Sequence, residues 1–133
     1  MIFHGRSIFR GKATGITLVT HQLISFFGGV DPETGIVVEK GHELEGRSIA
    51  GVILVFPTGK GSTVGSYTLY RLKENCHAPL AIVNAECEPI TAVGCIIVEI
   101  PCVDQIPISN IPSGIQAIVN GDEGIVTIED IPQ

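Results

Sequence analysis

Residues 54–67 of this 133-residue chain read Leu-Val-Phe-Pro-Thr-Gly-Lys-Gly-Ser-Thr-Val-Gly-Ser-Tyr. The apolar run that ends at Phe56 predicts a buried strand, and two hydroxyl residues after a glycine-bracketed turn predict the start of a helix. A helix N-terminus presents backbone N–H groups without helical partners and the positive end of the helix dipole. We therefore expect an anion, or an oxygen that becomes one, to be stabilised beside Ser62.

The sequence around this stretch predicts a strand–helix–strand unit over residues 49–83. The nearly continuous apolar run over 49–56 is typical of a strand covered on both faces, and a helix from about Thr63 to Asn75 leads to a second buried strand. β-Branched runs and turn residues elsewhere predict a strand-rich domain spanning 1–133. The further segments are strands at 7–9, 15–19, 36–39 and 95–100, a turn at 10–14, a helical turn at 88–93 and a hairpin at 114–128.

The composition limits the classes of function. Hydrophobic residues make up 44% of the chain and charged residues 17%, which excludes disorder and predicts that part of the surface contacts another protein. A net charge of −6 argues against a nucleic-acid partner. No apolar segment approaches the ~20 residues of a membrane span, and no signal-peptide block opens the sequence, so we expect a cytoplasmic protein with no membrane partner.

The turn after the first buried strand permits two interpretations. It is not an ATP-binding P-loop, because that motif requires glycine where Leu54 stands and Ser or Thr where Gly61 stands. Ser62 or Thr63 could simply cap the helix, which stabilises a helix by about 1 kcal/mol. Alternatively, Ser62 could carry chemistry, with Lys60 close by.

A second candidate is the glycine-rich segment at residues 26–35. Gly28 and Gly29 would let the backbone approach a ligand closely, and Asp31 adds a carboxylate. An ordinary β-turn beside a packed Phe pair explains the same residues equally well.

The cysteines and histidines give no metal-site pattern. No CxxC pair is present, so we expect reduced and mostly buried thiols and no metal bound by this chain. The histidines are isolated from one another and are interpreted as surface or packed residues. The residues concerned are Cys76, Cys87, Cys95, Cys102, His4, His21, His42 and His77.

Residues 59–63, Gly-Lys-Gly-Ser-Thr, follow a buried strand and Pro57 and resemble the Gly-x-Gly-Ser-Ser segment of the aconitase-family swivel domain. The wider pattern resembles the small subunit of aconitase X more closely, over nearly the whole chain. It implies a β-rich α/β fold, a swivelling β/β/α domain with a barrel-like sheet beside the parallel strand–helix–strand unit. The matching segments are 25–35, 42–46, 57–66, Ala78-Pro79 and Gly94.

The resemblance also implies a function. In that family a large subunit carries an iron–sulfur cluster on its own cysteines, and this chain would be the small subunit of a hydro-lyase that is active only with that partner. The complex would remove water from (R)-5-phosphomevalonate to give trans-anhydromevalonate 5-phosphate, in a modified mevalonate route to isoprenoids. The cluster's open iron would bind the substrate's tertiary hydroxyl as a Lewis acid.

The family's catalytic base maps to Ser62. Helix-end N–H groups and Lys60 could stabilise its alkoxide in a dry cleft. The small anionic hydroxy-acid substrate would lie among the remaining candidate residues, which are Gly59, Lys60, Gly61, Thr63, Gly28, Gly29 and Asp31.

One departure from the family leaves the substrate contacts open. Aconitases have Arg and Glu where this chain has Val64 and Gly65, so a carboxylate-binding Arg must come from the partner or from elsewhere in the chain. Two alternatives remain at this point. One is another hydroxy-acid dehydratase of the family, such as a hydroxyproline dehydratase, and the other is a non-enzymatic anion-binding module.

Overall fold

The computed structural model describes residues 1–60 and 64–128. Within these described residues, eight strands form one sheet, with three α-helices and a short 3-10 helix beside it. The strands are β1 (Ile2–His4), β2 (Arg6–Phe9), β3 (Lys12–Val19), β4 (Ile53–Phe56), β5 (Ala81–Asn84), β6 (Cys102–Asp104), β7 (Gln116–Asn120) and β8 (Ile125–Ile128). The helices are α1 (Phe26–Gly29), α2 (Gly65–Glu74), α3 (Pro89–Val98) and η1 (Ile108–Asn110).

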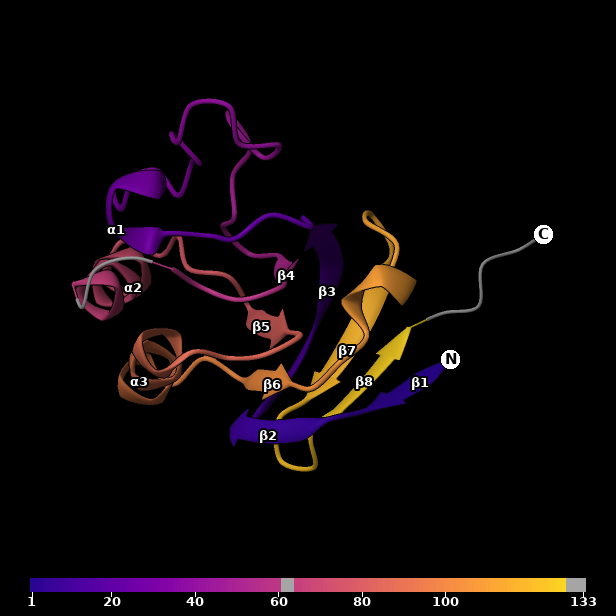
Figure 1. Ribbon diagram of the computed structural model, residues 1–133. Coiled ribbons are helices and arrows are strands. Elements are labelled where there is room, and N and C mark those ends of the chain that lie inside the picture. Colours follow the sequence, from indigo (N-terminus) through magenta and orange to yellow (C-terminus); the bar gives the residue numbers. More distant parts are fainter. Residues whose placement is uncertain (61–63, 129–133) are drawn as a thin grey trace.

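The sheet curls on itself like a barrel. Its strand order is β1-β8-β7-β3-β4-β5-β6-β2, so β1 and β2 lie at opposite edges although only Gly5 separates them in the chain. The two edges must therefore meet at Gly5, and Figure 1 shows β1 leading directly into β2. A Cβ atom at Gly5 would collide with the backbone oxygen of Asp104, so only glycine fits this crossing. The barrel-like sheet expected from the resemblance is confirmed.

The central strands are parallel and the outer ones antiparallel. β3, β4, β5 and β6 pair in parallel, and α2 connects β4 to β5, so the predicted strand–helix–strand unit is confirmed. α3 makes a second crossover, from β5 to β6. The predicted hairpin is the antiparallel pair of β7 and β8.

The strand predicted at 95–100 is wrong, because α3 continues to Val98. The segment is β-branched, but stronger helix signals precede it. The Glu88 carboxylate caps the first turn and Pro89 stands at the start of the helix, where its missing N–H costs nothing. The predicted helical turn at 88–93 is the first half of this helix.

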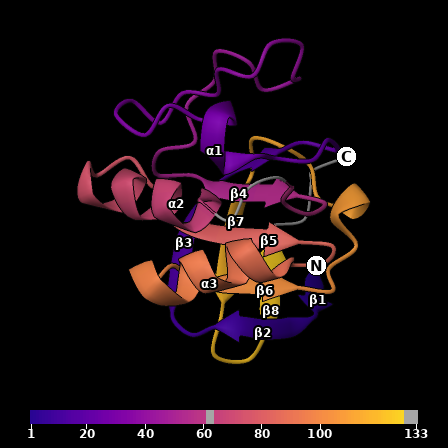
Figure 2. The same cartoon turned by 60° about the vertical axis from the view of Figure 1, so that its left-hand side comes forward.

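Two shorter predictions also fail. The expected turn at 10–14 lies largely in β3, because Lys12 already pairs with Asn120 of β7. The expected strand at 36–39 forms only isolated bridges within a long irregular connection between α1 and β4, which projects from the body of the molecule in Figures 1 and 2.

Alternate residues of the central strands serve two cores. In β4, Leu54 and Phe56 face α2 and α3, whereas Ile53 and Val55 point into the barrel. α2 and α3 lie side by side over one face of β4–β6 (Figure 2). Because β4 and β5 are parallel, the loops that follow Phe56 and Asn84 emerge at the same end of the sheet.

No helix among the described residues has the length and hydropathy needed to cross a bilayer.

Candidate active site

The segment after β4 is held by the loop after β5. The backbone oxygen of Pro57 accepts hydrogen bonds from the N–H groups of Ala85 (3.1 Å) and Glu86 (3.0 Å). The buried amide of Asn84 donates to the oxygen of Phe56 at 3.0 Å. Within the described residues the other amide atom of Asn84, Oδ1, is buried without a hydrogen-bond partner. The two loops are therefore joined by hydrogen bonds at the carboxyl end of the parallel strands, where α/β folds bind their ligands. We name these two loops the site layer.

Gly59 lies directly against the N-terminus of α3. Glu88 caps this helix by accepting from the N–H groups of Ile90 (2.8 Å) and Thr91 (2.6 Å) and from the Thr91 hydroxyl. A Cβ atom at Gly59 would stand 2.6 Å from Thr91 Oγ1 and 2.7 Å from Glu88 Oε1. Close packing against the α3 cap thus explains this glycine without a ligand.

The two glycine-rich candidates, predicted separately, are brought together by a third segment. Ile24 donates to the oxygen of Thr58 at 3.4 Å and accepts from the N–H of Lys60 at 3.0 Å. Since α1 follows Ile24 closely, its Gly28-Gly29 pair lies near the Gly59-Lys60 segment.

A carboxylate that sequence reasoning missed lies between the two candidates. Glu39 Oε2 is 4.0 Å from Lys60 Nζ, and a Cβ atom at Gly29 would be 3.4 Å from Glu39 Oε1. Lys60 is therefore already paired with an acid of its own chain. Glu39 ends the segment 36–39, which the sequence predicts only as a strand, so no local signal identifies it as a site residue.

The helix after the turn begins at Gly65, with Val64 as the N-cap residue. The hydrocarbon side chain of Val64 makes no capping hydrogen bond. Gly61, Ser62 and Thr63 lie outside the described residues, so their predicted roles stay predictions. Their described neighbours Lys60 and Val64 belong to the site layer.

A cavity of about 400 Å³ opens between the α1 segment and α2. Gly28 and Asp31 line it, together with Val64, Tyr67 and other residues of both elements, whereas Gly29 does not. The carboxylate of Asp31 also accepts the N–H of Glu33 at 2.9 Å, which stabilises the turn that follows α1.

Among the described residues that line the cavity, the cation is Arg71. Its guanidinium lies 3.8 Å from the carboxylate of Glu33. The cavity wall is otherwise mainly apolar, with Phe27, Val30 and Val38 opposite α2.

An ion pair between the exposed Arg6 and the buried Asp104 supports the loop that carries Glu88. Arg6 donates from Nε to Asp104 Oδ1 at 2.9 Å and from Nη2 to Oδ2 at 2.7 Å, and Cys87 N–H donates to the same Oδ2 at 2.9 Å. Burial acts to raise the pKa of Asp104, but the hydrogen bonds from Arg6 and Cys87 outweigh it and hold that pKa below its usual range. Asp104 thus stays charged and fixes the start of this loop.

The cysteines are free thiols. The pKa of Cys87 is raised far above its ordinary value, first by its hydrogen bond with Cys102 and then by burial. Cys95 and Cys102 are buried, and Cys76 is exposed. Within residues 1–60 and 64–128, no group of three His, Cys, Asp or Glu side chains could hold a metal ion. The raised pKa of Cys87 does not suit iron–sulfur ligation, which requires thiolates.

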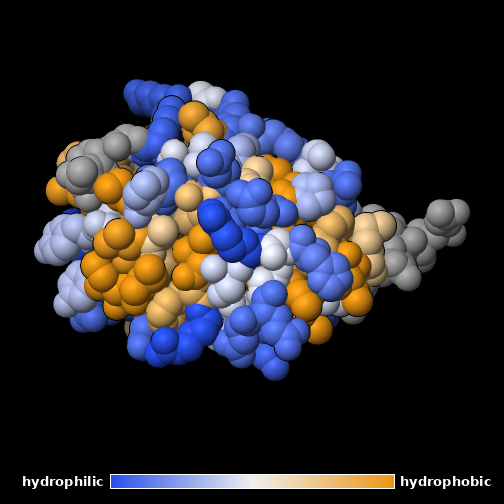
Figure 3. Space-filling model, turned by 60° about the horizontal axis from the view of Figure 1, so that its bottom comes forward, coloured by the Kyte–Doolittle hydropathy of each residue, from blue (hydrophilic) through white to orange (hydrophobic). Residues whose placement is uncertain are grey.

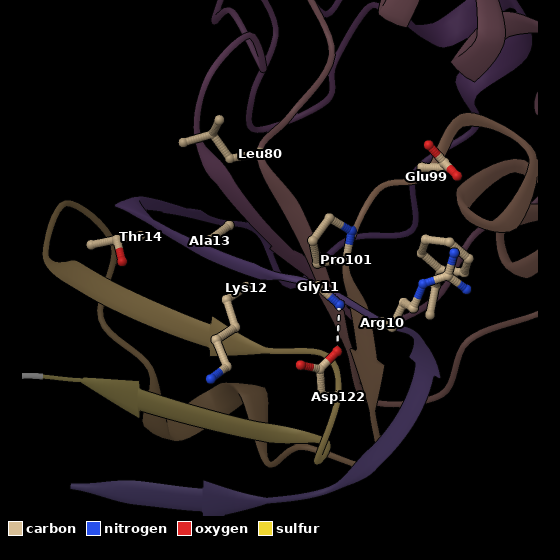
Figure 4. A pocket seen from close by; sticks show the side chains of 10 residues that line it. Arg10, Gly11, Lys12, Ala13, Thr14, Leu80, Glu99, Pro101 and Asp122 are labelled. Carbon is tan, nitrogen blue, oxygen red and sulfur yellow. Dashed lines mark hydrogen bonds between the residues drawn. The ribbon is translucent and has the colours of Figure 1, made fainter.

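A larger hollow, of about 530 Å³, lies elsewhere (Figure 4). Its lining includes Leu80, Pro101 and Asp122, and Asp122 accepts the N–H of Gly11 at 2.9 Å. Leu80 precedes β5 and Pro101 precedes β6, so this hollow lies at the amino ends of the parallel strands. That is the end opposite the site layer, and none of the predicted site residues lines it.

A curled mixed sheet, two crossover helices and a glycine-rich segment at the carboxyl end define a swivel-type domain. The chain belongs to the aconitase X swivel domain family, whose sequence profile matches residues 2–128.

Individual relatives agree with this membership. The phosphomevalonate dehydratase small subunit of Methanosarcina mazei is 55% identical, over 95% of this chain and 90% of its own length. The protein of the same name from Thermococcus kodakarensis is 52% identical, over 96% of each chain.

Solved structures share the fold. A chain in the crystal structure of Thermococcus kodakaraensis aconitase X, holo-form, is 50% identical with a TM-score of 0.96, covering 98% of this chain and 99% of that one. The solution NMR structure of a UPF0107 protein is 47% identical with a TM-score of 0.87, covering 98% of this chain and 100% of that one.

Proposed function

We propose that this chain is the small subunit of a phosphomevalonate dehydratase. The complex would convert (R)-5-phosphomevalonate into trans-anhydromevalonate 5-phosphate for isoprenoid synthesis. The observation that carries the proposal is a sequence identity above 50%, over nearly the full length of the chain, with relatives named phosphomevalonate dehydratase small subunit. The location of the glycine-rich segment at the carboxyl end of β4 supports it independently. The cytoplasmic location and the single domain over 1–133 remain predictions.

The partner is a large subunit, in a heterodimer or a higher assembly. We place the iron–sulfur cluster on that subunit, since Cys95 and Cys102 are buried in this chain and the pKa of the Cys87 thiol is raised by Cys102 and by burial. When bound there, the cluster supplies a Lewis acid for the departing hydroxyl. This chain by itself is therefore expected to be colourless and without dehydratase activity.

Ser62 is the proposed base that takes a proton from the carbon beside the substrate carboxylate. A serine hydroxyl is a weak base in water, so its alkoxide needs stabilisation by N–H dipoles at the start of α2. Lys60 lies two residues away and is shared with Glu39, which orients the ammonium group in the site layer. The cavity lined by Gly28 and Asp31 adjoins Val64 and gives the substrate room beside the segment.

Co-expression with the large subunit of the same genome tests the proposal. The purified complex should dehydrate (R)-5-phosphomevalonate and leave hydroxyproline unchanged, as followed by mass spectrometry of the product. Ser62→Ala should lower kcat by at least about 100-fold, the lower range for loss of an acid–base group, without weakening subunit binding. Ser109→Ala, which removes an exposed hydroxyl in η1, is the matched control and should keep full activity.

Two results would contradict the proposal at different levels. Near-normal kcat in the Ser62→Ala complex would remove Ser62 from the mechanism but leave the substrate assignment. A complex that forms but dehydrates only another hydroxy acid would overturn the substrate, and tight anion binding without any large-subunit complex would favour a binding module.

A further inference from the structure

α3 has the composition of a buried helix but lies on the surface. Its ten residues, Pro89–Val98, include no charged side chain. The inner face, with Cys95 and Val98, packs on the core. The outer face exposes Val93 (46%), Ile96 (49%) and Ile97 (60%). A helix that is apolar on all sides is normally enclosed, so this outer face lacks a cover.

α2 extends the same apolar surface. Tyr67 and Tyr70 expose 60% and 43% of their surface, and their rings stack with centroids 6.0 Å apart. Together with Ser66 and Ile97 they line a shallow hollow of about 360 Å³ between the two helices. The helices approach closely at Gly94, where an added Cβ atom would stand only 2.5 Å from Leu69 of α2.

We name this surface the α2–α3 face. Figure 3 shows hydrophobic side chains gathered on the side of the molecule where α3 lies in Figure 1. Stacked tyrosines and branched aliphatic side chains without charges are the composition of the buried centre of a protein interface. Its members are Val64, Tyr67, Tyr70, Val93, Ile96 and Ile97.

The α2–α3 face is continuous with the site layer. Val64 and Tyr67 belong to the face and also line the cavity that contains Gly28 and Asp31. A large subunit that brings its share of the active site to residues 59–64 must therefore lie over the adjoining turns of α2. The same body, extended across the hollow between the helices, would cover Ile97.

We propose that the α2–α3 face is the surface on which the large subunit docks, with its own apolar and uncharged patch against Tyr70 and Ile97. This inference rests on the proposed function, because it takes the large subunit as the occupant. The centre of the contact would be the hollow lined by Tyr67, Tyr70 and Ile97.

The test is the affinity of purified variants for the purified large subunit, measured by calorimetry. Ile97→Glu should weaken binding by at least about 30-fold, the effect of losing one central anchor residue, and Tyr70→Ala by about 10-fold. Ile118→Glu is the matched control, because Ile118 is an exposed isoleucine (45%) on β7, away from both helices. It should bind within about 3-fold of the wild-type chain. Circular dichroism checks that each variant folds, which exposed positions should permit.

The outcomes separate this inference from the proposed function. Wild-type affinity in both Ile97→Glu and Tyr70→Ala, with an active wild-type complex, would overturn the docking surface and leave the function intact. Failure of the wild-type chain to bind any large subunit would overturn both. If the isolated chain sediments as a dimer that Ile97→Glu dissociates, and large-subunit binding is unchanged, a second copy covers the face and the inference is wrong.

Discussion

Gly59→Ala is a stringent test of how the site layer is held. The backbone at Gly59 is not in the left-handed region, so alanine is permitted there by conformation. The obstacle is space, because the new Cβ would stand 2.6 Å from Thr91 Oγ1 and 2.7 Å from Glu88 Oε1. Either the carboxylate leaves its position and α3 loses its cap, or the segment after β4 shifts.

Both routes have similar costs. Loss of a helix cap lowers the free energy of unfolding by about 0.5–2 kcal/mol, and overpacking by about 1–3 kcal/mol. We therefore expect a loss of about 1–2 kcal/mol, or a fall in Tm of roughly 4–8 °C for a domain of this size. Gly65→Ala is the control, since its Cβ would lie 3.5 Å from Ile90, an ordinary contact, and alanine favours the helix.

Urea unfolding of both variants, alone and combined with Glu88→Ala and Thr91→Ala, measures the coupling. With both obstructing side chains shortened, Gly59→Ala should cost less than about 0.5 kcal/mol. If Gly59→Ala is as stable as the wild-type chain, or its cost is unchanged in the shortened background, the proposed packing of Gly59 against the α3 cap is refuted.

Two further predictions concern ionisable side chains, first two carboxylates and then the cysteines. The pKa of Asp104 is lowered by Arg6 despite its burial, and the pKa of Glu43 is lowered by hydrogen bonds from the Thr20 hydroxyl and the His21 N–H. Both charged carboxylates therefore stabilise the fold at neutral pH. That contribution should disappear as pH falls below about 5. Asp104→Asn should lower the free energy of unfolding at pH 7 by about 1–3 kcal/mol and flatten its fall between pH 6 and about pH 3; an unchanged slope would contradict the assignment. Iodoacetamide at about pH 8 should alkylate Cys76 in the folded chain and spare Cys87, Cys95 and Cys102, as measured by peptide mass spectrometry. Cys76 is exposed, Cys95 and Cys102 are buried, and the pKa of Cys87 is raised by Cys102 and by burial. Rapid labelling of Cys87 would refute the protection of this thiol by Cys102 and burial.

Local patterns predicted the centre of the fold and failed where distant contacts decide. The apolar run before Pro57 and the helical stripe after it identify β4 and α2 directly. In contrast, residues 95–98 are helical because Glu88 and Pro89 start a helix whose inner face packs on α2 and the sheet. A β-branched run alone does not reveal this packing against α2. Closure of the barrel at Gly5 depends on the pairing of β1 with β8 and of β2 with β6, which no short window contains.

The candidate site shows the same division. Its two glycine-rich segments carry turn signals and were found separately, but the pairing of Ile24 with Gly59 that joins them is not visible in either segment. Arg6 and Asp104 are 98 residues apart, and Glu39 ends a segment that the sequence predicts only as a strand. Charged groups that act through distant partners leave no spacing to detect.

The charges at the site explain why the chain needs a partner. The proposed substrate carries a carboxylate and a phosphate, yet this chain has a net charge of −6, and Glu39 and Glu88 stand beside the glycine-rich segment. Lys60 is paired with Glu39, and Arg71 lies near Glu33, so neither cation is reserved for a ligand. We therefore expect the large subunit to attract the substrate, whereas the contributions proposed for this chain are the Ser62 hydroxyl and the apolar α2–α3 face, which would help to keep water from the site.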